Sequence, residues 1–128
     1  MKVLVVEDNP MNMELVTYIL KSAGIEVIQA FDGPEALDKI KDTHLDLILL
    51  DIQLPGMDGL EVIKNIDQDH LSRKTPVVAL TAHAMQGDRQ KFINAGCAGY
   101  ISKPIDVSTF VGKVRSYVAN GGRAPEDT

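Results

Sequence analysis

The sequence LDLILLDIQLPG at residues 45–56 is a short apolar run that ends on Asp51 and is followed by a Pro-Gly turn. The run is too short to cross a membrane and is typical of a strand buried on both faces of a sheet. Open parallel sheets place their ligands at the carboxyl ends of such strands. Asp51 is therefore either a carboxylate that takes part in chemistry or simply a hydrophilic end to a buried strand.

Length and composition indicate one globular domain. The chain has 128 residues, of which 45% are hydrophobic and 24% charged, and this is enough for one core without disulfides. The net charge of −5 argues against nucleic acid as a partner, because the phosphate backbone selects basic surfaces. Cys97 has no partner for an internal disulfide, and the apolar start is too short for a signal peptide. We therefore expect a cytoplasmic protein that does not act on membranes.

Five strand-like segments alternate with five helix-like segments. The strands are expected at residues 2–8, 26–30, 45–51, 76–81 and 99–103. Helices are expected at about 9–24, from 33, from 59, at about 84–95 and from 106 to 121. In the first helix, Asn9 is the expected cap, and the spacing of Leu15, Ile19 and Leu20 predicts the buried face.

This alternation predicts an α/β fold with a doubly wound, five-stranded parallel sheet and right-handed crossovers. The first, third and fourth strands are the most apolar and should be central. The second and fifth strands should lie at the edges, which gives the flavodoxin-like order 2-1-3-4-5. We expect residues 1–120 to form the domain and residues 121–128, which begin with two glycines, to form a disordered tail.

Polar groups follow four of the five strands at their carboxyl ends, which should share one edge of the sheet. They are Glu7 and Asp8, Asp51, Thr81, and Lys103. Three neighbouring carboxylates repel one another and one lysine does not balance them, whereas Mg²⁺ takes oxygen ligands and keeps open positions for phosphate. The pattern predicts a site where Asp51 accepts a phosphoryl group and where Lys103 and the Thr81 hydroxyl contact its oxygens.

The chain resembles the receiver domain of two-component response regulators, the CheY-like superfamily, from about residue 2 to 119. The resemblance is carried by EDN at residues 7–9, LDIQLPGMDG at 50–59, Thr81-Ala82 and Lys103-Pro104, in the order of the family. The longer matches EDNPMN at 7–12, TAHAMQGD at 81–88 and GYISKPI at 99–105 are similar to single-domain cell-division regulators of the DivK type. They are equally similar to receiver modules of hybrid histidine kinases.

The resemblance implies a role for each matching residue. Asp51 would accept a phosphoryl group from the phosphohistidine of a sensor histidine kinase or histidine phosphotransfer protein. Asp8 and Asp51 would bind Mg²⁺, for which Mn²⁺ can substitute, together with the backbone carbonyl of Gln53, and Glu7 would help through water. These residues would form the metal site.

The resemblance also implies a conformational switch. Thr81 would turn its hydroxyl to the phosphoryl group, Lys103 would pair with that group, and Tyr100 would swing inward as Thr81 moves. The Lys103–Pro104 bond would be cis, and Ala82 would leave room for in-line access to Asp51.

The output that the resemblance implies is protein binding. We expect a signalling domain rather than an enzyme, although one that assists its own phosphorylation and dephosphorylation. Phosphorylation would alter binding to a downstream protein through the fourth helix, the fifth strand and the fifth helix. The DivK-type match implies a role in cell-division or polarity control.

Two other classes fit less well. A Mg²⁺-dependent hydrolase of the haloacid dehalogenase type needs a second acid two residues after its nucleophile, where this chain has Gln53. A flavodoxin-type carrier needs a phosphate-binding loop after the first strand, where Glu7 and Asp8 would repel the phosphate. The sequence leaves open that Glu7 is only a solvated acid and that Tyr100 is ordinary strand packing. His83, two residues past Thr81, is a candidate for controlling access of water.

Overall fold

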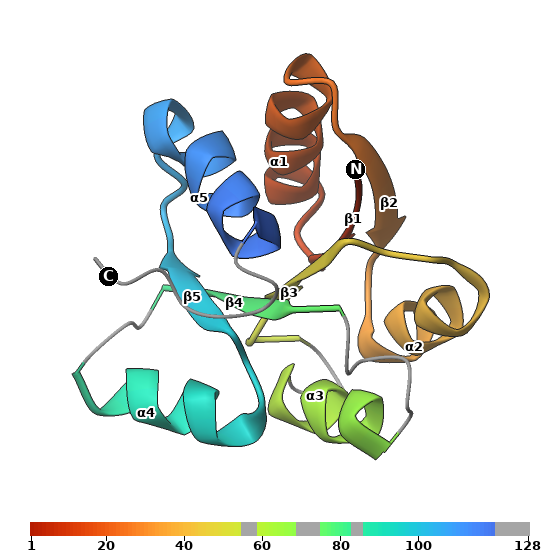
Figure 1. Cartoon of the computed structure of the whole chain (residues 1–128), viewed down its shortest axis with the longest axis vertical. Coiled ribbons are helices and arrows are strands. Elements are labelled where there is room, and N and C mark those ends of the chain that lie inside the picture. Colours follow the sequence, from red (N-terminus) through yellow and green to blue (C-terminus); the bar gives the residue numbers. More distant parts are fainter. Residues whose placement is uncertain (55–58, 69–74, 83–85, 120–128) are drawn as a thin grey trace.

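In the computed structural model, a five-stranded sheet lies between two layers of helices (Figure 1). The structure describes residues 1–54, 59–68, 75–82 and 86–119. The strands are β1 (Lys2–Val6), β2 (Glu26–Ala30), β3 (Leu47–Asp51), β4 (Val77–Thr81) and β5 (Gly99–Ser102). The helices are α1 (Pro10–Ser22), α2 (Gly33–Asp42), α3 (Gly59–Gln68), α4 (Gln86–Ala95) and α5 (Val107–Ala119).

All neighbouring strands are parallel, and their order is β2-β1-β3-β4-β5. The predicted fold class and strand order are thus confirmed. Every residue of β3 and β4 is buried, whereas β2 at the edge has one fully buried position. The difference follows from position, since the central strands are covered on both faces while an edge strand is open on one side.

Helices α1 and α5 cover one face of the sheet, and α2, α3 and α4 cover the other (Figure 1). Successive strand residues point to opposite faces. Val3 and Val5 therefore pack with the α1 and α5 side chains, and Leu4 and Val6 pack on the other face. Burying each such side chain contributes about 1.5–3 kcal/mol relative to leaving it in water.

Helix α1 begins as predicted, and its buried face contains two of the three predicted residues, Ile19 and Leu20. The Asn9 side chain accepts hydrogen bonds from the backbone N–H groups of Met11 and Asn12 at 2.9 and 3.1 Å, which caps the helix. The prediction that Leu15 faces inward is wrong, because this side chain is 40% exposed. Beside Ile19, the buried face consists of Met13, Val16, Thr17 and Leu20, which have the i, i+3, i+4, i+7 spacing of one helix face.

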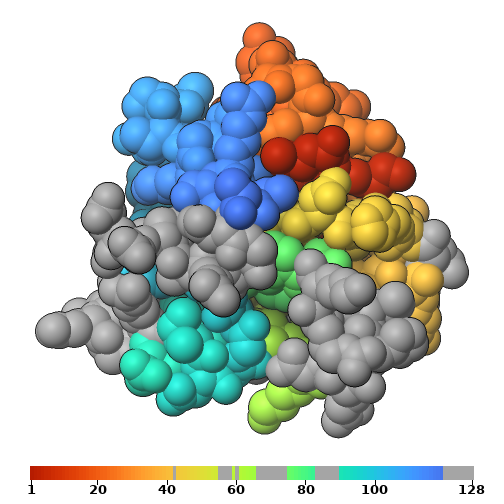
Figure 2. All heavy atoms as spheres, in the orientation of Figure 1, coloured from red at the N-terminus to blue at the C-terminus, as the bar shows by residue number. Residues whose placement is uncertain are grey.

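Helix α5 packs beside α1 on the same face of the sheet. In the space-filling view, the side chains of α5 (blue) meet those of α1 (orange) (Figure 2). Phe110, Val114 and Tyr117 are buried and lie on one face of α5. Tyr117 lies so close to β5 that a Cβ atom on Gly99 would overlap its hydroxyl group and ring. A glycine is therefore required at this position for α5 to approach the edge strand.

Some expectations concern residues outside the described part of the chain. They include His83 and the tail at residues 121–128. Within the described residues, no helix has both the length and the apolar character needed to span a bilayer.

Candidate functional site

The carboxyl ends of β1, β3, β4 and β5 hold the residues that the sequence singled out. Backbone hydrogen bonds continue the strand ladders beyond the strands themselves. The Glu7 N–H donates to the Ala30 carbonyl at 3.0 Å, and the Lys103 N–H donates to the Thr81 carbonyl at 2.8 Å. These bonds fix the backbone of Glu7 and Lys103 and direct both side chains towards Asp51.

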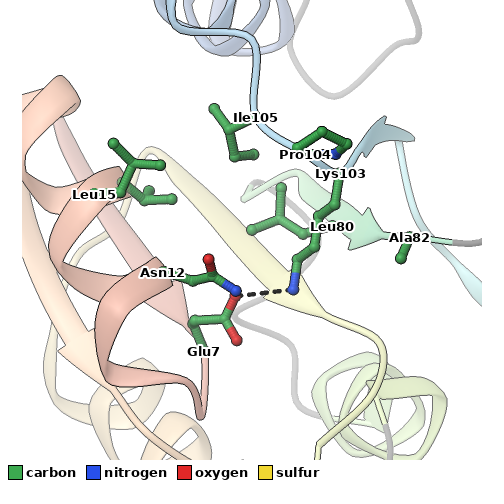
Figure 3. A pocket seen from close by; sticks show the side chains of 9 residues that line it. Glu7, Asn12, Leu15, Leu80, Ala82, Lys103, Pro104 and Ile105 are labelled. Atoms are coloured by element: carbon green, nitrogen blue, oxygen red, sulfur yellow. Dashed lines mark hydrogen bonds and ion pairs between the residues drawn. The ribbon is translucent and has the colours of Figure 1, made fainter.

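Lys103 joins two buried carboxylates. Its Nζ atom lies 2.9 Å from Oε1 of Glu7 and 3.0 Å from Oδ2 of Asp51. Glu7 is only 1% exposed and Asp51 only 4%. Figure 3 shows Lys103 extending from the β5–α5 segment to Glu7 at the end of β1. The interpretation of Glu7 as a solvated acid is therefore wrong.

Asp8 completes a group of three acids. One carboxylate oxygen from each of Glu7, Asp8 and Asp51 lies within 4.8 Å of the others. Asp8 is exposed, unlike the other two. The second oxygen of Asp51, Oδ1, accepts a hydrogen bond from the Gln53 N–H at 2.9 Å. The cluster is thus open to solvent on the side of Asp8 and fixed by protein contacts on the side of Lys103.

The burial of the cluster changes its proton affinities. Burial raises the pKa of Glu7 to about 7; the neighbouring Asp51 adds to the rise, and Lys103 opposes it. For Lys103, burial disfavours the charged form, but hydrogen bonds to Glu7 and Asp51 outweigh this effect and raise its pKa. Lys103 therefore stays charged at neutral pH, whereas Glu7 gains or loses its proton near neutral pH.

The donor set fits a hard divalent cation. The three acids offer only oxygen atoms within a small volume, and such ligands suit Mg²⁺. A cation would also stabilise the ionised form of Glu7 against the effect of burial. The carbonyl of Gln53 as a further ligand stays a prediction.

The predicted switch residues lie on neighbouring strands. Thr81 ends β4 and is buried. Tyr100 on β5 is half-buried, and its ring centroid lies 6.2 Å from that of Phe92 on α4. The backbone of Tyr100 pairs with Ala79, two residues before Thr81. The Tyr100 ring thus lies near Phe92 of α4, and the switch role of Thr81 and Tyr100 stays a prediction.

A cleft of about 300 Å³ opens beside the acidic cluster. It contains Glu7 and Lys103 at its polar end (Figure 3). Asn12 and Leu15 project from α1 on one side, and Pro104 and Ile105 face them from the other. The remaining lining residues are Val16, Leu80 and Ala82. The Lys103–Pro104 peptide bond is cis, as the resemblance implied.

The sequence did not single out this apolar end of the cleft. Asn12 and Leu15 are three residues apart, so both lie on the same side of α1. That spacing is a signal for this end of the cleft, but the spacing of Leu15 with Ile19 predicts a core position instead. Ala82 was expected to leave access to the site, and it does line the cleft.

A family model covers most of this chain. The family model described as "response regulator receiver domain" matches residues 3–115. This chain therefore belongs to the response regulator receiver domain family, whose members act in two-component signalling.

Individual relatives add detail. The polar-differentiation response regulator DivK of Brucella ovis is 46% identical over 118 residues, which is 92% of this chain and 96% of DivK. A sensor histidine kinase receiver domain from Pseudomonas aeruginosa, solved with magnesium in its active-site cleft, has a TM-score of 0.84 at 33% identity, covering 92% and 97% of the two chains. The structure of the Saccharomyces cerevisiae phosphotransfer protein Ypd1 with the receiver domain of Ssk1 matches with a TM-score of 0.86 at 30% identity, covering 95% and 91%.

Proposed function

We propose that Asp51 accepts a phosphoryl group from the phosphohistidine of a sensor histidine kinase or histidine phosphotransfer protein. The observation that carries this proposal is the contact of Lys103 Nζ with the buried Asp51 carboxylate at 3.0 Å. A fixed cation beside a buried acid can stabilise the charge that a phosphoryl group brings. The proposed metal ligands are Asp8, Asp51 and the backbone carbonyl of Gln53, with Glu7 acting through water.

The transfer is a displacement at phosphorus. An oxygen of Asp51 forms the new O–P bond while the N–P bond to the donor histidine breaks, and the leaving imidazole takes its proton from solvent. Lys103 and the Thr81 hydroxyl bind the phosphoryl oxygens. When bound, Mg²⁺ neutralises negative charge on the acids and on the phosphoryl group. This chain's own contribution is to position these groups rather than to provide a further covalent step.

The cleft supports a protein as the donor. Its apolar end is continuous with an exposed stripe on α1 formed by Met11, Leu15 and Tyr18, which are 79%, 40% and 71% exposed. Exposed apolar side chains in one stripe fit the apolar face of a partner helix. We propose that a helix carrying the donor histidine packs on this stripe, which we call the α1 stripe. In the Ypd1–Ssk1 co-crystal structure, the partner of the receiver domain is likewise a histidine phosphotransfer protein.

We propose that phosphorylation is read by a downstream protein at α4, β5 and α5. Ile93 on α4 is 37% exposed and offers an apolar contact there. Movement of Thr81 towards the phosphoryl group would free space for Tyr100 and change this surface. The similarity to DivK supports a role in cell-division or polarity control. Residues 1–120 are the proposed functional unit. A receiver module of a hybrid histidine kinase is the second candidate.

The test is phosphorylation by acetyl phosphate and Mg²⁺, followed by intact-protein mass spectrometry. We expect one added phosphoryl group that hydroxylamine removes, as for an acyl phosphate, and none in Asp51→Asn. Asp38→Asn is the matched control, because Asp38 is an exposed acid on α2. Equal phosphorylation of Asp51→Asn and the parent would refute the assignment.

A further inference from the structure

We propose that Gly59 is a positioning residue for phosphoryl acceptance. Its missing side chain lets the first turn of α3 pack directly on the backbone that joins Asp51 to Gln53. The inference rests on the function proposed above and adds to it a residue that lies outside the acidic cluster.

Gly59 contacts the chain immediately after β3. Its N–H donates a hydrogen bond to the Ile52 carbonyl at 2.9 Å. A Cβ atom on Gly59 would lie 2.6 Å from Cα of Ile52 and 3.0 Å from the carbonyl oxygen of Asp51. These neighbours are backbone atoms, so no rotation of a side chain relieves the contact. A side chain at residue 59 would have to displace either α3 or the backbone of Asp51 and Ile52.

Other glycines differ from Gly59 in what surrounds them. Gly24 has a φ of +81° and open space around it, and a Cβ atom on Gly112 would also meet nothing within 4 Å. Gly99 meets the side chain of Tyr117. Among the described glycines, positive φ values occur at Gly24 and Gly96. The requirement at Gly59 is therefore close approach rather than an unusual backbone conformation.

The displaced segment would carry the reacting group with it. Asp51 Oδ2 contacts Lys103, and Oδ1 accepts the Gln53 N–H at 2.9 Å. A shift of Ile52, which lies between Asp51 and Gln53, changes the distance between the acceptor oxygen and the carbonyl proposed to bind the metal. Changes in residues that support metal ligands typically weaken metal binding by roughly 10- to 100-fold.

The experiment compares Gly59→Ala with Gly112→Ala, a glycine-to-alanine change in a helix with no close neighbour. Isothermal titration calorimetry measures the Mg²⁺ dissociation constant, and mass spectrometry measures the rate of phosphorylation by acetyl phosphate at saturating Mg²⁺. We expect Gly59→Ala to bind Mg²⁺ about tenfold or more weakly and to be phosphorylated more slowly. Gly112→Ala should match the parent. Parental Mg²⁺ affinity in Gly59→Ala would overturn the inference, whereas failure to phosphorylate the parent would overturn the proposed function.

A second variant separates backbone contact from side-chain contact. The Cδ1 atom of Ile52 would also lie 2.9 Å from the new Cβ atom. Adding Ile52→Ala to Gly59→Ala removes that atom but leaves the contact with Cα. We expect the double variant to remain impaired in Mg²⁺ binding, and full recovery would contradict the backbone argument.

A measurement on the unaltered protein does not depend on the folding of any variant. Coupling between two sites is reciprocal. If the packing of Gly59 on Ile52 strengthens Mg²⁺ binding, then Mg²⁺ binding should in turn stabilise the hydrogen bond between Gly59 and Ile52. We expect Mg²⁺ to slow hydrogen exchange of the Gly59 amide, measured by NMR, while the amide of Gly112 serves as the reference. Unchanged exchange at Gly59 under saturating Mg²⁺ would overturn the proposed coupling.

Discussion

The Nζ atom of Lys103 lies 3.0 Å from Oδ2 of Asp51, although 52 residues separate them in the chain. The contact exists because β3 and β4, and β4 and β5, run parallel and end at the same edge of the sheet. It places a permanent cation against the proposed acceptor before any phosphoryl group arrives. Such preorganisation avoids the cost of rearranging charges during the reaction.

The first prediction concerns this lysine. Lys103→Met should lower the rate of phosphorylation by acetyl phosphate by roughly 100-fold, the typical effect of removing one preorganised group that stabilises charge. Lys113→Met is the control, because Lys113 is an exposed lysine on α5. The rates are measured by intact mass at saturating Mg²⁺. A parental rate in Lys103→Met would show that the contact with Asp51 is not used in the reaction.

The second prediction concerns the metal. A ligand that binds only the folded state stabilises it, by about 1.4 kcal/mol at ten times the dissociation constant. Mg²⁺ should therefore raise the melting temperature by roughly 5 °C. Asp8→Ala should abolish the rise, whereas Glu14→Ala, which removes an exposed acid on α1, should not. A full Mg²⁺ response in Asp8→Ala would disprove the role of Asp8 as a ligand.

The third prediction concerns pH in the absence of Mg²⁺. The pKa of Glu7 is raised from 4.5 to about 7 in the folded protein, so the folded state binds this proton more tightly than the unfolded chain. The resulting stabilisation is complete below pH 4.5 and is lost as the pH rises through about 7. Between about pH 5 and pH 8, the free energy of unfolding should fall by on the order of 2 kcal/mol.

Glu7→Gln provides the control for this pH dependence. The amide does not titrate, so the fall measured by urea unfolding in chelator should largely disappear. Addition of Mg²⁺ to the parent should also reduce the fall, because a cation favours the ionised carboxylate. If Glu7→Gln retains the slope of the parent, another group is responsible for it.

The fourth prediction separates two surfaces. Leu15→Ser on the α1 stripe should slow transfer from a phosphorylated histidine phosphotransfer protein that is an active donor to the parent. The same change should leave phosphorylation by acetyl phosphate near the parental rate, because a small donor needs no helix contact. Ile93→Ser on α4 is the matched control and should affect neither rate. Slower transfer in Ile93→Ser but not in Leu15→Ser would mean that the donor binds at α4 instead of the α1 stripe.

The fifth prediction concerns the contact between β5 and α5. Gly99→Ala should destabilise the protein by roughly 1–3 kcal/mol, because the new methyl group overlaps the Tyr117 side chain. Tyr117→Phe removes the closest atom, the hydroxyl oxygen, and should recover part of the loss in the double variant. Urea unfolding of the four proteins in the cycle gives the coupling energy. Strict additivity would mean that the overlap is relieved elsewhere.

Much of the fold was predictable because a strand that is buried on both faces consists almost entirely of apolar residues. The unbroken apolar character of residues 47–50 and 77–80 indicated central strands, and the mixed character of residues 26–30 indicated an edge. Once the strands are parallel and ordered, their carboxyl ends must share one edge. The grouping of Glu7, Asp51 and Lys103 therefore followed from the sequence through topology.

The burial of individual side chains at the site depended on tertiary packing, which the local sequence pattern does not predict. Glu7 and Asp8 are adjacent acids of one cluster, yet Glu7 is buried against Lys103 and Asp8 is exposed. Leu15 looked like a core residue because helical spacing alone does not distinguish the face on the sheet from the face towards Ile105.

The sequence by itself determined the sheet, its order and the edge that carries the acids, since these depend on which segments are apolar and how parallel strands connect. Only the tertiary structure decided which acid is buried, that Leu15 of α1 faces the cleft and how closely Gly59 approaches the strand that ends in Asp51. Those features arise from contacts between segments far apart in the chain, where a difference of about one ångström decides whether a side chain fits.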